Sequence, residues 1–102
     1  MRVVEVANAM LSRSMGLIEA ARRISGEHLY SSHGDEPSDH DYLRFVGIDS
    51  ETDHLPIGPV RKYWSQEALR QKDDEIRAYE SFARESAVAA AKNLVSKLAK
   101  HI

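Results

Sequence analysis

Residues 65–98 read SQEALRQKDDEIRAYESFARESAVAAAKNLVSKL, and this stretch decides the fold. Ser65 is a favourable residue at a helix start, and the polar residues after it suit a first helical turn. From there, apolar or small residues recur every three or four positions, which is the period of an amphipathic helix: Leu69, Ile76, Tyr79, Ala83, Ala87, Ala90, Leu94 and Leu98. The pattern predicts one long C-terminal helix, of about 34 residues and roughly 50 Å if it is unbroken.

A second long helix is predicted at the N-terminus, over residues 3–24. Its apolar residues recur with the same period, while polar and charged residues take the other side: Val3, Val4, Ala7, Met10, Leu11, Leu17, Ile18, Ala21 and Ile24. Arg22 and Arg23 suit the negative end of a helix dipole, and Gly26 suits the left-handed residue that often ends a helix. Gly16 lies inside this helix at a cost of about 1 kcal/mol relative to alanine. We expect the two long helices to pack antiparallel.

The two predicted helices differ in length, and the difference bears on the oligomeric state. A helix over residues 3–24 is about 35 Å long and cannot cover the C-terminal one. Either the C-terminal helix bends at the charged run Lys72–Glu75, or a second copy of the chain buries the part that extends beyond. A flat alanine face, with Gly16 as its complement, would let another helix approach closely: Ala83, Ala87, Ala89, Ala90 and Ala91. We therefore expect a homodimer.

The region between the long helices is predicted to begin with a loop and a short helix. Residues 27–37 are polar and rich in turn formers, which favours an exposed loop. Ser38 precedes Asp39-His40-Asp41 in the arrangement of a capping box, so we expect a helix there that fades near Thr52. The apolar run 42–48 is also compatible with a buried strand, and the cap favours the helix.

A connector over residues 55–64 follows the central helix. Pro56, Gly58 and Pro59 forbid a regular continuation, and Trp64 is expected to anchor the connector to the core. Together the elements predict an all-α fold, a small helical bundle of two long helices, a shorter central helix and a proline-containing connector. The 102 residues, 42% of them hydrophobic, suffice for one ordinary core and not for two, so residues 1–102 should form a single helical domain.

Composition and hydropathy argue against several classes of protein. The chain has no cysteine, which removes disulfides and thiolate metal sites and fits a reducing compartment. Met1–Ala9 lacks the uninterrupted apolar run of a secretory signal, and no window approaches the roughly 20 apolar residues of a membrane span. The net charge is -2, whereas a nucleic-acid-binding domain favours a basic stripe. We expect a cytoplasmic protein that binds neither membranes nor nucleic acid.

The acidic residues are concentrated in the middle of the chain. Eight of the sixteen lie between Glu27 and Asp53, where Arg44 is the only Lys or Arg, so eight acids less one arginine give about seven net negative charges. The flanking regions are mildly positive. Opposite charge raises encounter rates and selects partners, so the segment predicts binding of a basic protein. The candidate binding residues are Asp35, Asp39, Asp49, Glu51, Asp53 and His54.

Three patterns of metal binding or catalysis are incomplete in this segment. Residues 49–53 place three carboxylates at alternating positions, as at the start of a calcium loop, but His54 stands where glycine is needed and Val60 where a bidentate glutamate is needed. Ligand types of a zinc or non-haem iron site are present at no recognised spacing: His28, His33, His40, His54, Asp35, Asp39, Asp41 and Asp53. Glu51, Asp53 and His54 could share acid–base catalysis in a suitable pocket, which nothing in the sequence indicates. The sequence therefore predicts no metal site and no cofactor.

Residues 16–26 (GLIEAARRISG), 45–58 (FVGIDSETDHLPIG) and 60–65 (VRKYWS) resemble those of a family of small, uncharacterised bacterial proteins. The similarity covers most of the chain. It implies a bacterial, cytosolic setting and carries no catalytic or binding assignment.

The sequence as a whole favours a non-catalytic protein-interaction module over an enzyme. In this hypothesis the module presents its acidic segment to a basic partner, and an immunity-like or adaptor-like inhibitor is one concrete form. The alternative is a small metal-dependent enzyme that uses the central histidines with nearby aspartates: His28, His33, His40 or His54 with Asp49 or Asp53.

Overall fold

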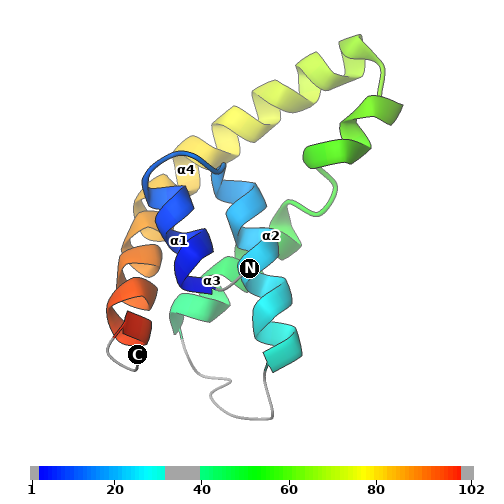
Figure 1. Cartoon of the computed structure of the whole chain (residues 1–102). Helices are drawn as coiled ribbons and strands as arrows, with labels where there is room; N and C mark the ends of the chain where they lie inside the picture. Colours follow the sequence, from blue (N-terminus) through cyan, green and yellow to red (C-terminus); the bar gives the residue numbers. More distant parts are fainter. Residues whose placement is uncertain (1–2, 32–39, 100–102) are drawn as a thin grey trace.

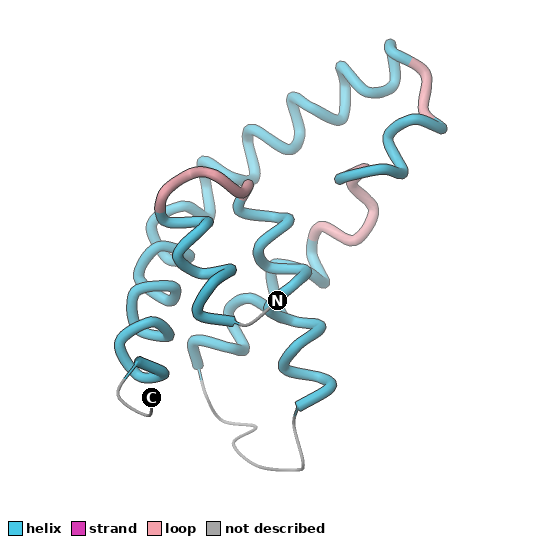
Figure 2. The backbone as a smooth tube through the Cα atoms, in the orientation of Figure 1, coloured by secondary structure: helices cyan, strands magenta, loops and turns pink. Residues whose placement is uncertain are grey.

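The structure, a computed structural model, describes residues 3–31 and 40–99, and every regular element in these ranges is helical (Figure 1, Figure 2). In chain order the elements are α1 (Val3–Leu11), α2 (Leu17–Ser31), α3 (His40–Glu51), the 3-10 helix η1 (Gly58–Tyr63) and α4 (Gln66–Ala99). The predicted all-α class is confirmed, and the central apolar run forms a helix rather than a strand. Ser38 and Asp39 of the predicted capping box lie outside the described residues. None of the described helices is both long and apolar enough to cross a membrane.

The predicted single helix over residues 3–24 is wrong. Two short helices take its place, and they lie side by side, joined by a turn at residues 12–16 (Figure 1). The predicted pair of long antiparallel helices is therefore replaced by a short hairpin packed against α3 and α4. Gly26 does not end a helix as predicted, because α2 continues through it to Ser31. The cost of about 1 kcal/mol for an interior glycine is small enough for tertiary packing to override.

The turn between α1 and α2 begins with a specific helix-ending pattern. Arg13 adopts a left-handed conformation with φ 65°. Its amide donates to the Met10 carbonyl at 3.1 Å, and the Ser14 amide donates to the Ala9 carbonyl at 3.0 Å. These two bonds form a Schellman motif, in which Arg13 occupies the position where glycine is usual. The hydroxyls of Ser12 and Ser14 also donate to the Ala9 carbonyl, at 3.1 Å and 3.2 Å, and so compete with continued helix.

The core lies between α1, α2, α3 and the C-terminal part of α4 (Figure 1). Its fully buried large side chains come from all four helices: Met10, Leu17, Ile18, Ile24, Phe45, Ile48 and Leu94. Four of the alanines that predicted a close helix approach are buried in this core: Ala83, Ala87, Ala90 and Ala91. The alanine face therefore serves contacts within the chain, except at Ala89, which is exposed.

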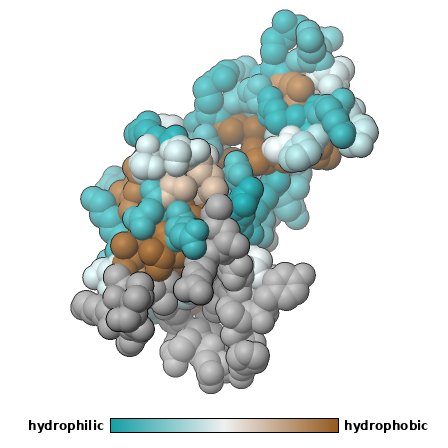
Figure 3. Space-filling view, in the orientation of Figure 1, coloured by the Kyte–Doolittle hydropathy of each residue, from teal (hydrophilic) through white to brown (hydrophobic). Residues whose placement is uncertain are grey.

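η1 and the first turns of α4 project from the bundle as an arm, which we define as residues 58–75 (Figure 1). Leu55 and Pro56 are buried at its base, whereas Val60 is 45% exposed. Figure 3 shows apolar surface on the arm surrounded by hydrophilic residues. Trp64 is half-buried and lies outside the core cluster, so its predicted role as the core anchor is wrong. Leu55 and Pro56 fill that role instead.

α4 is one continuous helix of 34 residues, with no break at the charged run Lys72–Glu75. The part of α4 in the arm is supported by the connector of the same chain. Arg61 of η1 contacts Asp73 through two bonds, from Nη1 to Oδ1 at 2.9 Å and from Nη2 to Oδ2 at 3.0 Å. The hydrogen bond from Arg61 lowers the pKa of Asp73. The chain itself therefore supports this part of α4, and a second copy is not needed to cover it. The homodimer stays a prediction.

Candidate functional site

Four of the predicted binding residues lie in the described part of the chain, at the C-terminal end of α3 and in the turn after it: Asp49, Glu51, Asp53 and His54. Asp35 and Asp39 lie outside the described residues. The four do not gather around one pocket, because their side chains face different neighbours. Asp49 Oδ1 lies 3.9 Å from Arg22 Nε, whereas Asp53 is exposed.

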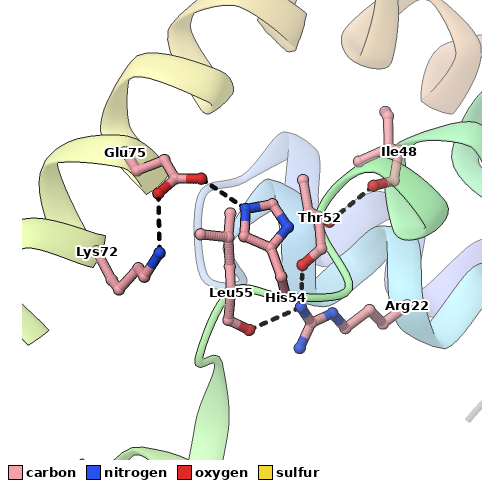
Figure 4. Close-up of polar contacts among 7 residues, drawn as sticks. All are labelled: Arg22, Ile48, Thr52, His54, Leu55, Lys72 and Glu75. Atoms are coloured by element: carbon pink, nitrogen blue, oxygen red, sulfur yellow. Dashed lines mark hydrogen bonds and ion pairs between the residues drawn. The ribbon is translucent and has the colours of Figure 1, made fainter. Parts of the chain in front are cut away.

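Arg22 of α2 joins that helix to the C-terminal end of α3 (Figure 4). Its Nη2 donates to the carbonyl oxygens of Thr52 at 2.5 Å and Leu55 at 2.9 Å. Thr52 and Leu55 lie just beyond the end of α3, and the Thr52 carbonyl also accepts from the Leu55 amide at 3.0 Å. Arg22 therefore gives the Thr52 carbonyl a second donor and donates to the Leu55 carbonyl as well. Thr52 is buried, and its hydroxyl donates to the Ile48 carbonyl at 2.7 Å. No periodicity in the sequence signals the Arg22 contacts, because the partners lie 30 and 33 residues away.

His54, Glu75 and Lys72 form a polar chain at the base of the arm (Figure 4). His54 Nε2 lies 2.6 Å from Glu75 Oε2, and Lys72 Nζ donates to Glu75 Oε1 at 3.3 Å. The hydrogen bonds from His54 and then from Lys72 lower the pKa of Glu75. A carboxylate that two donors hold in its ionised form is a poor general base. His54, predicted as a binding residue, thus tethers the turn after α3 to α4.

Glu51, Tyr79 and Phe82 make up a surface that we call the acidic–aromatic face, and the exposed Asp53 follows Glu51 by two residues. The Tyr79 hydroxyl donates to Glu51 Oε1 at 2.5 Å, and the Tyr79 ring lies 6.1 Å, centroid to centroid, from the tilted ring of Phe82. Phe82 is 79% exposed, which is unusual for so large an apolar side chain. Phe82 is not among the binding residues predicted from the sequence. Phe82 does not belong to the apolar residues that recur every three or four positions along α4, and this position in the sequence indicates an exposed ring.

The contact between Tyr79 and Glu51 can be tested by titration. Burial, and then the bond to Glu51, raises the pKa of Tyr79 to about 12. The raised pKa favours the protonated phenol in the folded state. Its contribution to stability is therefore present below the ordinary pKa of about 10 and is lost as the pH rises through about 12.

Replacing Glu51 with glutamine is expected to lower the pKa of Tyr79 while leaving it above its ordinary value, since the burial remains. Phenolate absorbance measures this titration, and Tyr79→Phe identifies the step that belongs to Tyr79. Circular dichroism at the same pH shows whether the protein is still helical. A titration that is identical in Glu51→Gln and the unchanged protein would contradict the predicted contact.

Among residues 3–31 and 40–99, no group of three or more His, Cys, Asp or Glu side chains is placed to hold a metal ion. The calcium-loop pattern does not converge on one point, because Asp49 faces Arg22 while Glu51 bonds to Tyr79. The side chains of His28 and His33 lie outside the described part of the chain. In the part that is described, no observation favours the metal-dependent enzyme.

Comparison of the chain with models of protein families, with curated proteins and with solved structures finds no match. The bacterial setting implied by residues 16–26, 45–58 and 60–65 therefore stays a prediction.

Proposed function

We propose that the protein is a non-catalytic protein-interaction module that presents its acidic–aromatic face to a basic partner protein. The observation that carries the proposal is the exposure of Phe82, at 79%, on a helix whose other side is buried. An exposed ring forgoes the free energy that burial in the core would contribute. Aromatic side chains are also enriched at protein interfaces, where a few of them contribute most of the binding free energy.

The carboxylate of this face and that of Asp53 support a basic partner. Glu51 and Asp53 are exposed and neither forms an ion pair with a described residue, although Arg44 lies close enough to Tyr79 to offset part of the rise in the pKa of Tyr79. Asp41 and Asp49 differ, because they lie 2.7 Å and 3.9 Å from cationic side chains of α4 and α2. Fewer acidic side chains in the described part of the segment are therefore left without an ion pair than the sequence suggests, and one of them, Glu51, contacts Tyr79 of the aromatic pair. Such charge steers association with a partner of opposite sign.

The partner can be identified from the surface itself. A photo-crosslinking aromatic amino acid in place of Phe82 is expected to capture a basic protein. The same amino acid in place of Arg70, an exposed residue of α4 outside the face, is expected not to capture it. Capture of the same proteins from both positions would count against the acidic–aromatic face as the binding surface.

With the captured partner purified, the double variant Glu51→Gln/Asp53→Asn is expected to bind more slowly, with a weaker dependence of the association rate on salt. Phe82→Ala is expected to weaken the affinity by about 2 kcal/mol, mainly through faster dissociation. Surface plasmon resonance over a range of salt concentrations measures both effects. Glu5→Gln/Glu67→Gln is the matched control, because it removes two exposed charges of the same sign outside the acidic–aromatic face. Equal losses in the two double variants, or rates independent of salt, would refute the proposal.

A further inference from the structure

A second surface of α4 holds a pocket rich in arginine, away from the acidic–aromatic face. Tyr79 and Arg84 are five residues apart, which places them about 140° apart around the helix axis at 3.6 residues per turn. The pocket has a volume of about 420 Å³ and is lined by Arg13, Arg77, Glu80, Ser81 and Arg84. We propose that it binds the phosphate group of a small-molecule phosphate monoester.

The arginines reach this pocket from two elements of the fold. Arg77, Ser81 and Arg84 follow one another at four and three positions, so α4 presents them on one side over two turns. Arg13 comes from the turn between α1 and α2, at the position with φ 65°. Glycine adopts this conformation at lower cost than any residue with a side chain. The turn therefore places a long cationic side chain against α4 at a position where the backbone alone favours glycine.

The positive charge of the pocket is only partly neutralised by the residues around it. Within the described residues, the side chains of Arg13 and Arg84 have no ion pair or hydrogen bond, and Arg77 pairs only with an exposed aspartate of its own helix. Glu80 directs Oε2 toward the backbone nitrogen of Ile18, 3.5 Å away at the start of α2, and makes no ion pair with a described residue. Three arginines less Glu80 and the aspartate paired with Arg77 leave one net positive charge. Like charges held together repel, and a bound anion relieves this repulsion.

A phosphate monoester matches the pocket in charge, hydrogen-bonding groups and size. At pH 7 such a group carries about 1.5 to 2 negative charges and three acceptor oxygens, whereas a carboxylate offers the three guanidinium groups one charge and two oxygens. Guanidinium groups donate in pairs to phosphate oxygens, and the Ser81 hydroxyl is a further donor. Sites for small ligands run from about 300 to 1,000 Å³. The volume of about 420 Å³ thus leaves room for an organic part beside the phosphate.

Titration of the full chain with glycerol 3-phosphate at constant ionic strength, followed by nuclear magnetic resonance of the backbone amides, tests the proposal. Saturable shifts are expected for the amides of Ser81 and Arg84. Glycerol 3-phosphate should bind several-fold more tightly than inorganic phosphate, and glycerol should not bind. Arg84→Gln and Arg13→Gln are each expected to weaken the binding by about tenfold or more, because each removes charge-assisted hydrogen bonds.

Arg70→Gln is the matched control, since Arg70 is an exposed arginine of the same helix that does not line the pocket. Its affinity for glycerol 3-phosphate should stay within about twofold of the unchanged protein, as expected for a charge outside the site. Arg84→Lys keeps the charge and loses the paired donors, so intermediate affinity is expected. Glu51→Gln/Asp53→Asn should leave this binding unchanged, which separates it from the protein-interaction function.

Three results would overturn the proposal. The first is the absence of saturable shifts with either phosphate compound. The second is an equal loss of affinity in Arg70→Gln and Arg84→Gln, which would indicate general screening by the charge of α4. The third is equal affinity for inorganic phosphate and glycerol 3-phosphate, which would exclude the monoester as the preferred ligand. Thermal unfolding of each variant shows whether the comparison is made between folded proteins.

Discussion

Replacing Phe45 with alanine is expected to lower the free energy of unfolding by about 3–5 kcal/mol. Phe45 lies on α3, has no exposed surface and is the largest of the fully buried side chains. Its loss removes the transfer free energy of the ring and leaves a cavity between helices that can only partly close. Domains of this size are stable by about 5–15 kcal/mol, so the variant should lose a large share of its stability. Urea unfolding followed by circular dichroism measures the change.

The chain contains its own control for this experiment, because its other phenylalanine is exposed. Phe82→Ala makes the same chemical change at a side chain that is 79% exposed, and its effect should stay within about 0.5 kcal/mol. The two variants therefore separate burial from the identity of the residue. Similar losses of stability at the two positions would show that the assignment of α3 to the core is incorrect.

Replacing Arg22 with methionine is expected to lower the free energy of unfolding by about 2–3 kcal/mol. The Leu55 carbonyl loses its Arg22 donor, and the Thr52 carbonyl keeps only the Leu55 amide, just beyond α3 where Thr52 is fully buried. Methionine retains much of the aliphatic stem, so the change reports mainly on the hydrogen bonds. The Arg22 side chain is 27% exposed, and water at the site limits the loss to this range. Hydrogen exchange of the amides at the end of α3 is expected to quicken together with the loss of stability.

The adjacent residue provides the matched comparison for Arg22. Arg23 pairs with Glu19 at 3.0 Å on the exposed side of α2. Exposed pairs of this kind contribute only a few tenths of a kcal/mol, so Arg23→Met should be nearly neutral. If the two methionine variants unfold at the same urea concentration, the junction between Arg22 and α3 does not stabilise the fold.

The fold class could be predicted from the sequence because α4 repeats one period over its whole length. The break between α1 and α2 could not, since apolar residues keep the helical period on both sides of it. The residue that ends α1 is Arg13 in a left-handed conformation, and a sequence reading expects glycine there. Gly26 produced the opposite error, because a glycine signals a helix end only when tertiary packing does not favour a longer helix.

The candidate site was harder to predict than the fold. Its acidic residues are visible in the sequence as a local excess of negative charge. Whether each of them forms an ion pair depends on residues far away in the sequence. Arg22 reaches the end of α3 across 30 residues, and Tyr79 reaches Glu51 across 28. Side-chain contacts of this kind follow from the packing of helices and leave no periodic trace in the sequence. The arginine pocket is similar, because Arg13 and Arg84 meet only once the turn after α1 lies against α4.

α4 passes through two regions that are stabilised by different forces. Around Ala83–Leu94 its inner side lies in the apolar core, whereas in the arm it is braced by the ion pairs of Asp73 with Arg61 and of Glu75 with His54. Those ion pairs are screened by salt, and because the pKa values of Asp73 and Glu75 are lowered, their contribution is lost as the pH falls through the lowered values. Apolar burial responds to neither change in this way. We therefore expect the two parts of this uninterrupted helix to unfold separately. The arm should unfold locally while the rest of α4 and the bundle stay folded.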